Sequence, residues 1–288
     1  MYDLLIAPFA EFGFMQRALV GAFALALGAA PVGVFLMLRR MSLMGDAMAH
    51  AILPGAGVGY LVAGLSLPAM TIGGLVAGVT VAVLAGMVAR FTSLKEDASL
   101  AAFYLVSLAL GVMLVSLRGS NVDLLHVLFG TVLALDNATL YLLGGITSIT
   151  LVTLALVYRG LVLECVDPQF LRTVSGAGAP VHFIFLGLVV LNLVGGFHAL
   201  GTLLAVGMMM LPAAGARLWT TDITKLLVIA VGAGMASGYA GLIASYHAGV
   251  PAGPAIILAA GGFYLVSLAF GTEGGFLRRL LPARHLEA

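Results

Sequence analysis

Asp46 and His50 are the residues whose types and spacing most directly suggest chemistry, in the apolar stretch "MGDAMAHAILPG". A spacing of four places both side chains on one face of a helix, close enough to share a ligand. Carboxylate and imidazole together suit a divalent transition metal such as zinc or manganese. The same pair also suits a proton relay or a structural hydrogen bond, and Asp46 could instead cap the start of its helix. Spacing alone leaves these interpretations open.

Two further sets of residues are weaker candidates. Asp123 and His126 stand three apart in "VDLLHVLFG" and could form an outer entrance for an ion or a polar cap on an interfacial helix. His198 could be a further ligand along a path, or a polar side chain that reaches toward the membrane surface.

The surroundings of these residues are those of a membrane protein. Of 288 residues, 62% are hydrophobic and 9% are charged, against about 25% charged in a soluble domain. The net charge of +1 and the lack of a basic stripe give no sign of a nucleic-acid partner. A single cysteine, Cys165, excludes a disulfide within the chain. The N-terminus lacks the basic start and small-residue cleavage site of a signal peptide.

Apolar segments of about 20 residues predict transmembrane helices. The sequence therefore predicts an all-α polytopic membrane protein with eight to nine transmembrane helices, in a single transmembrane domain over residues 1–288. Eight spans remain an alternative because two segments, 44–62 and 181–196, are short or polar. The predicted spans are 13–38, 44–62, 68–89, 98–117, 137–158, 181–196, 198–216, 224–246 and 254–271.

The basic residues predict the orientation, because Lys and Arg favour the cytoplasmic side. With the N-terminus outside and alternating spans, all of the 13 basic residues except Arg17 and Arg118 fall inside. This places the C-terminus in the cytoplasm. The longest inner loop, 159–180, contains the turn signal Asp167-Pro168 and room for a short helix. This loop could contact another protein or serve only as a connector.

Any ATP-driven function needs a partner. A phosphate-binding loop requires Lys followed by Ser or Thr after a glycine-rich turn. The only two lysines, Lys95 and Lys225, are followed by Glu96 and Leu226. The chain therefore lacks this motif, and a separate subunit would have to hydrolyse ATP.

Six segments together resemble the permease subunits of bacterial ABC importers for zinc and manganese, the ZnuB and MntB types. They follow the order of that family over residues 17–271. The segments are "LRRMSLMGDAMAHAILPG", "LKEDASLAAFYLVSLALGVMLVS", "VDLLHVLFG", "DPQFLRTVSGAG", "GTLLAVGMMMLPAAGARL" and "PAGPAIIL".

The resemblance implies a fold similar to that of the cobalamin and iron-siderophore importers. It also implies a homodimer of this chain, two cytoplasmic ATPase subunits and an extracytoplasmic metal-binding protein. In such transporters the loop that matches 167–178 carries a coupling helix that docks in the ATPase. The residues expected to take part here are Asp167, Pro168, Phe170, Leu171, Val174 and Gly176.

The family motif "GDA..H" falls on Gly45, Asp46, Ala47 and His50, which implies that Asp46 and His50 line the translocation path. The predicted function is therefore that of a non-enzymatic permease subunit in the bacterial inner membrane. It would bind no permanent cofactor and would import zinc, with manganese as the next choice. The alternatives are a proton-coupled secondary metal transporter and a membrane scaffold that transports nothing.

Overall fold

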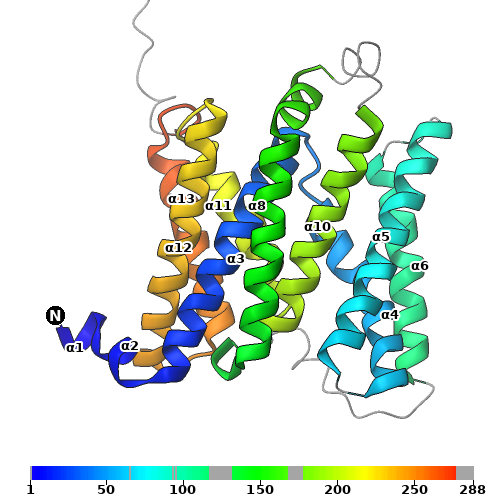
Figure 1. The fold of residues 1–288 in the computed structure, drawn as a ribbon. Helices are drawn as coiled ribbons and strands as arrows, with labels where there is room; N and C mark the ends of the chain where they lie inside the picture. Colours follow the sequence, from blue (N-terminus) through cyan, green and yellow to red (C-terminus); the bar gives the residue numbers. More distant parts are fainter. Residues whose placement is uncertain are drawn as a thin grey trace, which may run out of the picture.

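The chain folds into a bundle of helices (Figure 1). The computed structural model describes residues 2–64, 66–92, 94, 96–116, 132–167 and 178–276. Two short helices, α1 (Tyr2–Leu5) and α2 (Ala7–Glu11), precede the bundle, and a 3₁₀ turn, η1, covers Val132–Ala134. The long helices are α3 (Gly13–Leu38), α4 (Met44–Ala63), α5 (Leu67–Phe91), α6 (Glu96–Ser116), α8 (Asn137–Val166), α10 (Gly178–Leu200), α11 (Thr202–Ala216), α12 (Ile223–Ala248) and α13 (Ala252–Phe270).

The predicted all-helical membrane fold is confirmed, whereas the predicted number of spans is not. Among the described residues, 6 helices are long and apolar enough to cross a membrane. They are α3, α5, α8, α10, α12 and α13. The apolar parts of α6 and α11 are shorter. Helix α4 is not among the 6, and it carries Asp46, His50 and several glycines.

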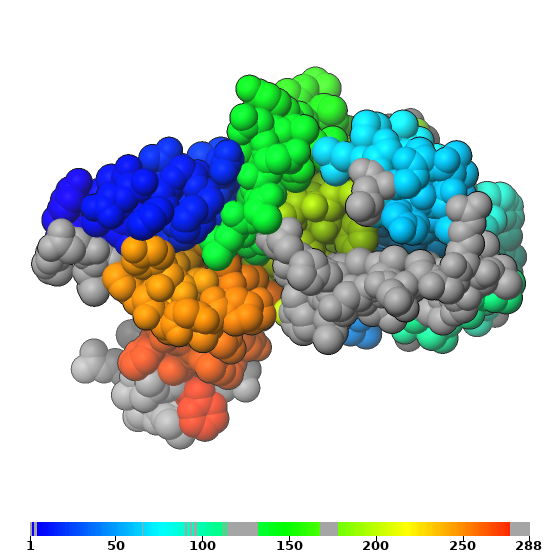
Figure 2. Space-filling view, turned by 90° about the horizontal axis from the view of Figure 1, so that it is seen from below, coloured from blue at the N-terminus to red at the C-terminus, as the bar shows by residue number. Residues whose placement is uncertain are grey.

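The helices divide into two groups joined by α8 and α10. Helices α4, α5 and α6 pack against one another on one side, while α3, α11, α12 and α13 pack together on the other (Figure 1). The view from below shows the same division, with α8 and α10 between the two groups (Figure 2). Helix α10 contacts α3, α4, α5, α8 and α11. It is therefore the main element between the two groups, which also meet directly where α4 contacts α11.

Small residues allow these helices to pack closely, as is usual in membranes. A side chain at Gly33 of α3 would overlap the carbonyl oxygen of Met209 on α11. In the same way, Gly55 of α4 and Gly73 of α5 each lie against the other's carbonyl oxygen. Both crossings depend on glycine, because no side chain fits between the backbones.

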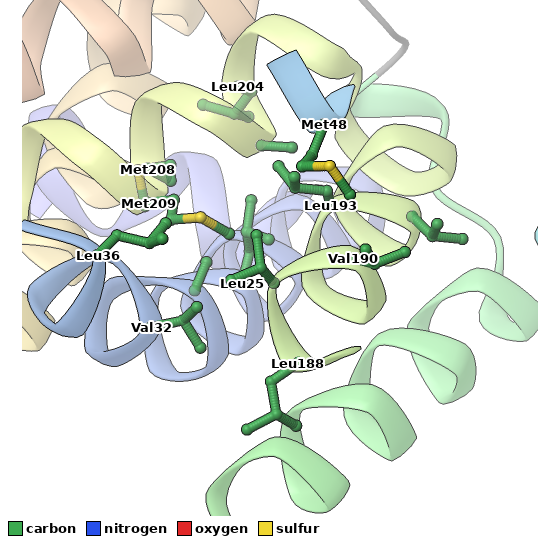
Figure 3. Packing of buried hydrophobic residues seen from close by; sticks show 14 of the residues in the cluster. Leu25, Val32, Leu36, Met48, Leu188, Val190, Leu193, Leu204, Met208 and Met209 are labelled. Carbon is green, nitrogen blue, oxygen red and sulfur yellow. The ribbon is translucent and has the colours of Figure 1, made fainter. Parts of the chain in front are cut away.

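A buried apolar core fills the centre of the bundle (Figure 3). Met48 of α4 lies beside Leu193 of α10 and is fully buried (Figure 3). Met208 and Met209 of α11 are also fully buried. Flexible thioether side chains fill irregular spaces well, and here they join α4 and α11 to the core.

Two helix ends differ from the sequence expectation. Helix α8 continues to Val166, since the segment after Arg159 holds a single glycine, which a helix tolerates, and no proline before Asp167-Pro168. With α10 starting at Gly178, the connection is shorter than the predicted loop 159–180. Helix α10 also runs through His198, and the break before α11 falls at Gly201, whose φ of 90° suits glycine. His198 therefore lies at the end of α10 and not at the start of the next helix.

The turn from α3 to α4 is short and closed by backbone hydrogen bonds. The N–H of Arg40 donates to the carbonyl of Met37 at 3.2 Å, and that of Met41 donates to Leu36 at 2.9 Å. This is a Schellman-type helix end, in which the residue after the C-cap is left-handed and usually glycine. Here that residue is Arg40, with a φ of 59°, so the turn carries some backbone strain.

Candidate functional site

The structure places Asp46 and His50 on one face of α4, as their spacing predicts. Asp46 lies in the first turn of the helix, where a negative charge interacts favourably with the helix dipole. Oδ1 of Asp46 lies 3.8 Å from Nε2 of His50, too far for a direct hydrogen bond. The Asp46 side chain is 70% exposed and that of His50 is 32% exposed. The two groups are therefore close neighbours that are not locked to each other.

Helix α6 holds the ring of His50 in place. The imidazole stacks on Tyr104 of α6, with ring centroids 6.3 Å apart and planes inclined by 29°. One turn further along, the hydroxyl of Ser107 donates to the carbonyl of Ala51 at 3.0 Å. His50 is thus oriented by an aromatic neighbour and not by a hydrogen bond, and its Nδ1 is buried without a partner among the described residues.

The opposite face of α4 anchors the helix. Met48 is buried in the core, and Gly45 lies against the sulfur atoms of Met209 and Met210 on α11. A Cβ on Gly45 would meet the Met210 sulfur at 3.7 Å. Asp46 and His50 consequently project from a helix whose other side is fixed, so their positions are set by packing and not by a flexible loop.

His198 is a separate polar site near the end of α10. Its Nδ1 lies 2.9 Å from the carbonyl of Val194, which can only accept, so Nδ1 must donate. Nε2 then carries a lone pair, and it is buried without a partner among the described residues. The geometry leaves this nitrogen able to accept a hydrogen bond or bind a metal ion.

The described part of the chain brings no three potential ligands together. Within it, no group of three or more His, Cys, Asp or Glu side chains is arranged to hold a metal ion. Asp46 and His50 therefore form a pair that His198 does not complete. A pair leaves most coordination positions to water or to groups from elsewhere, which suits brief binding better than permanent retention.

Several predicted site residues fall outside the described residues. These are Asp123 and His126 of the proposed outer entrance, together with Pro168, Phe170, Leu171, Val174 and Gly176 of the predicted coupling helix. Asp167 is described and follows the last residue of α8, where its N–H donates to the carbonyl of Leu163 at 2.8 Å.

Sequence reasoning missed a buried ionic cluster formed by Arg39, Glu164 and His182. Nη2 of Arg39 donates to Oε1 of Glu164 at 3.1 Å, and Nδ1 of His182 lies 3.4 Å from the same oxygen. Arg39 Nη2 also contacts His182 Nδ1 directly. The guanidinium carbon lies 5.0 Å from the centre of the Phe185 ring, a cation–π contact.

All three side chains of this cluster are less than a tenth exposed, at 9%, 8% and 7%. A charged side chain in an apolar segment usually has a partner of opposite charge. The position of Glu164 in such a segment therefore indicates that it is paired. Nothing in the sequence indicates that α3, α8 and α10 bring these particular residues together. No role is predicted for His182, and Arg39 is predicted only to lie on the inner side of the membrane.

Comparison with known proteins identifies the relatives of the chain. The sequence model of the ABC 3 transport family matches residues 11–271. The manganese transport system membrane protein MntC of Halalkalibacterium halodurans is 32% identical over 93% of this chain and 91% of its own length. The manganese import system permease protein ScaB of Streptococcus gordonii is 29% identical over 93% of this chain and 95% of its own.

A solved structure supports the same relationship. PsaBC from Streptococcus pneumoniae, in complex with Fab, contains a chain that is 29% identical and superposes with a TM-score of 0.84. The match covers 98% of this chain and 100% of the other. The helices of the two chains therefore follow the same path over nearly their full length.

Proposed function

The chain belongs to the ABC 3 transport family, and from this premise we propose that it is the membrane-spanning subunit of an ATP-driven manganese importer. The observation that carries the proposal is the pair Asp46 and His50, held on one face of α4 at 3.8 Å without a hydrogen bond between them. This subunit performs no covalent chemistry. ATP hydrolysis takes place in a separate subunit. This agrees with the sequence, because neither of the two lysines is followed by the Ser or Thr that a phosphate-binding loop requires.

Manganese takes precedence over zinc, which reverses the order expected from the sequence. The sequence favours zinc because histidines outnumber carboxylates among the candidate ligands Asp46, His50, Asp123, His126 and His198. His198 does not join Asp46 and His50 in a three-ligand group within the described residues, so that reason loses its force. One exposed carboxylate with one imidazole and water suits manganese, and the relatives described above are named for manganese. Zinc is the second candidate.

The path for the ion borders the exposed face of α4. A carboxylate facing lipid costs a few kcal/mol, and Asp46 is 70% exposed on the isolated chain. This cost is avoided where the face lines a water-filled passage closed by a second copy of the chain. We therefore place the path at the interface of a homodimer, with Asp46 and His50 contributed by each copy.

The proposal assigns a different partner to each end of the bundle. An extracytoplasmic binding protein delivers manganese at the end that holds α1 and α2 (Figure 1). The cytoplasmic ATPase docks at the other end, on the connection between α8 and α10, through Phe170, Leu171 and Val174. On its way in, the ion would first meet Asp123 and His126. It would then bind briefly to Asp46 and His50. His198 on α10 is a further candidate ligand along the path. The N-terminus then lies outside and the C-terminus in the cytoplasm.

The test is uptake into proteoliposomes that contain this chain, its ATPase subunit and its binding protein. Manganese and zinc compete, with and without ATP, for the wild type and for Asp46→Ala combined with His50→Ala. The matched control is Val58→Ala with Val62→Ala, which has the same spacing on the same helix and changes side chains that are 44% and 82% exposed.

The proposal predicts ATP-dependent uptake that prefers manganese, is abolished by the Asp46 and His50 double change, and survives in the valine control. Uptake driven by a pH gradient without ATP would contradict it and favour a proton-coupled transporter. Unchanged uptake after loss of both polar side chains would remove the pair from the path.

A further inference from the structure

The Arg39, Glu164 and His182 cluster joins the ends of three helices. Arg39 is the C-cap of α3, Glu164 lies in the last turn of α8, and His182 lies near the start of α10. Both ends of the connection between α8 and α10 are therefore tied to the end of α3. Under the proposed function, this is the connection on which the ATPase acts.

One member of the cluster, Arg39, is also close in sequence to Asp46 and His50, the metal pair of the proposed function. Residues 40–45 alone separate Arg39 from Asp46. Backbone hydrogen bonds close this stretch, with Met44 N–H donating to the Met41 carbonyl and Ala47 N–H donating to that of Leu43, each at 3.1 Å. A short hydrogen-bonded turn transmits displacement better than a flexible loop. A shift of Arg39 would therefore be passed to the first turn of α4.

The ionic contacts of the cluster are incomplete. Nη1 of Arg39 and Oε2 of Glu164 are buried and have no hydrogen-bond partner among the described residues. Leaving a buried polar atom unpaired is unfavourable, so these two atoms would gain from any new partner that a movement of the helix ends brings to them. Elements with two discrete arrangements are the parts of proteins that carry conformational coupling.

We propose that Arg39, Glu164 and His182 are positioning residues that couple movement at the α8 and α10 ends to the α4 helix carrying Asp46 and His50. The cluster does not contact the ion. It links the helix ends that move with ATP hydrolysis to the helix that binds the metal. Each hydrolysis event is thereby converted into a displacement of Asp46 and His50. This inference rests on the proposed function.

The experiment measures manganese ions transported per ATP hydrolysed, in proteoliposomes that hold the complete transporter. The first variant is Arg39→Met with Glu164→Leu, since replacing a buried ion pair by apolar side chains of similar size is often tolerated. The second is Glu164→Gln, which keeps the shape and removes the charge. The control is Thr150→Val, which removes a buried contact with Asn192 of 2.8 Å between α8 and α10, away from their joined ends. Thermal unfolding and manganese affinity are measured on each protein.

The inference predicts that both cluster variants transport about tenfold less manganese per ATP, while manganese affinity stays at the wild-type value. Thr150→Val keeps the wild-type ratio. A merely structural role would lower the unfolding temperature and the amount of active transporter without changing the ratio. If the apolar double variant fails to assemble, Glu164→Gln decides by the same criterion.

A wild-type ratio in either folded cluster variant overturns the inference and leaves the proposed function intact. A wild-type transporter without ATP-driven uptake overturns the proposed function itself, and the coupling role with it. The two failures are thereby distinguished within one set of measurements.

Discussion

The metal pair and the ionic cluster are two polar sites that are linked through residues 40–45, and their burial and pairing are opposite. Asp46 and His50 are partly exposed and are not hydrogen-bonded to each other. Arg39, Glu164 and His182 are each less than a tenth exposed and share short polar contacts. If Asp46 and His50 bind the ion as proposed, burial and pairing, and not residue type, separate a site open to cargo from one that holds helices together.

The two sites should respond differently when one of their charged side chains is removed. A buried charge that loses its counter-charge remains in a medium of low dielectric constant, which is strongly unfavourable. An exposed charge that loses its neighbour is solvated instead. Substitutions in the cluster should therefore affect stability first, and substitutions in the metal pair should affect transport with little effect on stability.

The largest effect on stability is expected for Glu164→Ala. Arg39 would remain buried without its counter-charge, and the free energy of unfolding should fall by about 3–5 kcal/mol. Unfolding of the purified protein in detergent, followed by circular dichroism, measures the change. Adding Arg39→Met should restore most of the loss. Equal loss in the single and double variants would show that the charge pair is not what stabilises the cluster.

A smaller effect is expected for Tyr104→Leu. The ring of Tyr104 stacks on His50, and such pairs contribute about 1 kcal/mol beyond burial. The variant should lose about that much stability and import manganese severalfold more slowly, since His50 is no longer held in its orientation. Tyr141→Leu is the matched control, because Tyr141 is 80% exposed. Uptake at the wild-type rate in the Tyr104 variant would show that the stack does not orient the ligand.

The turn between the two sites should become more stable in Arg40→Gly. Arg40 has a φ of 59°, a conformation that is unfavourable for side chains and that glycine adopts freely. The expected gain in the free energy of unfolding is about 0.5–1 kcal/mol, which is the left-handed penalty less the entropy that glycine loses on folding. Arg217→Gly is the control, since Arg217 has a φ of −62° at the end of α11 and the same change there should destabilise. Destabilisation at both positions would argue against strain in the turn.

The smallest change in stability is expected for Asp46→Asn. The carboxylate is exposed and its main structural contribution is to the helix dipole, worth about 0.5 kcal/mol. Manganese uptake should nevertheless fall sharply, because the amide is a weaker ligand without charge. A loss of stability as large as that of Glu164→Ala would reveal a structural pair and erase the contrast between the two sites.

Much of the local structure could be predicted from sequence because it depends on local signals. The spacing of Asp46 and His50 fixed their common helix face, and long apolar runs indicated the helices. The predicted span 137–158 ends before the helix does, because it stops at Arg159 whereas α8 continues to Val166. Arginine side chains can reach the interface from within a helix, so charge alone locates a helix end poorly.

The ionic cluster could not be predicted, because it depends on contacts between residues far apart in the chain. Arg39 and Glu164 are separated by 125 positions, and their meeting is decided by how α3, α8 and α10 pack. The same holds for the failure of His198 to join the metal pair. Sequence spacing shows which residues share a helix face, whereas the tertiary packing decides which faces meet.

The most direct test of manganese binding at the α4 pair is the nitrogen modulation of the electron spin echo of Mn²⁺ bound to the assembled transporter. The account predicts imidazole nitrogen modulation in the wild type that disappears in His50→Gln and persists in His198→Gln. Modulation that persists in His50→Gln, or that is absent from the wild type, would contradict the claim that His50 contacts the transported ion.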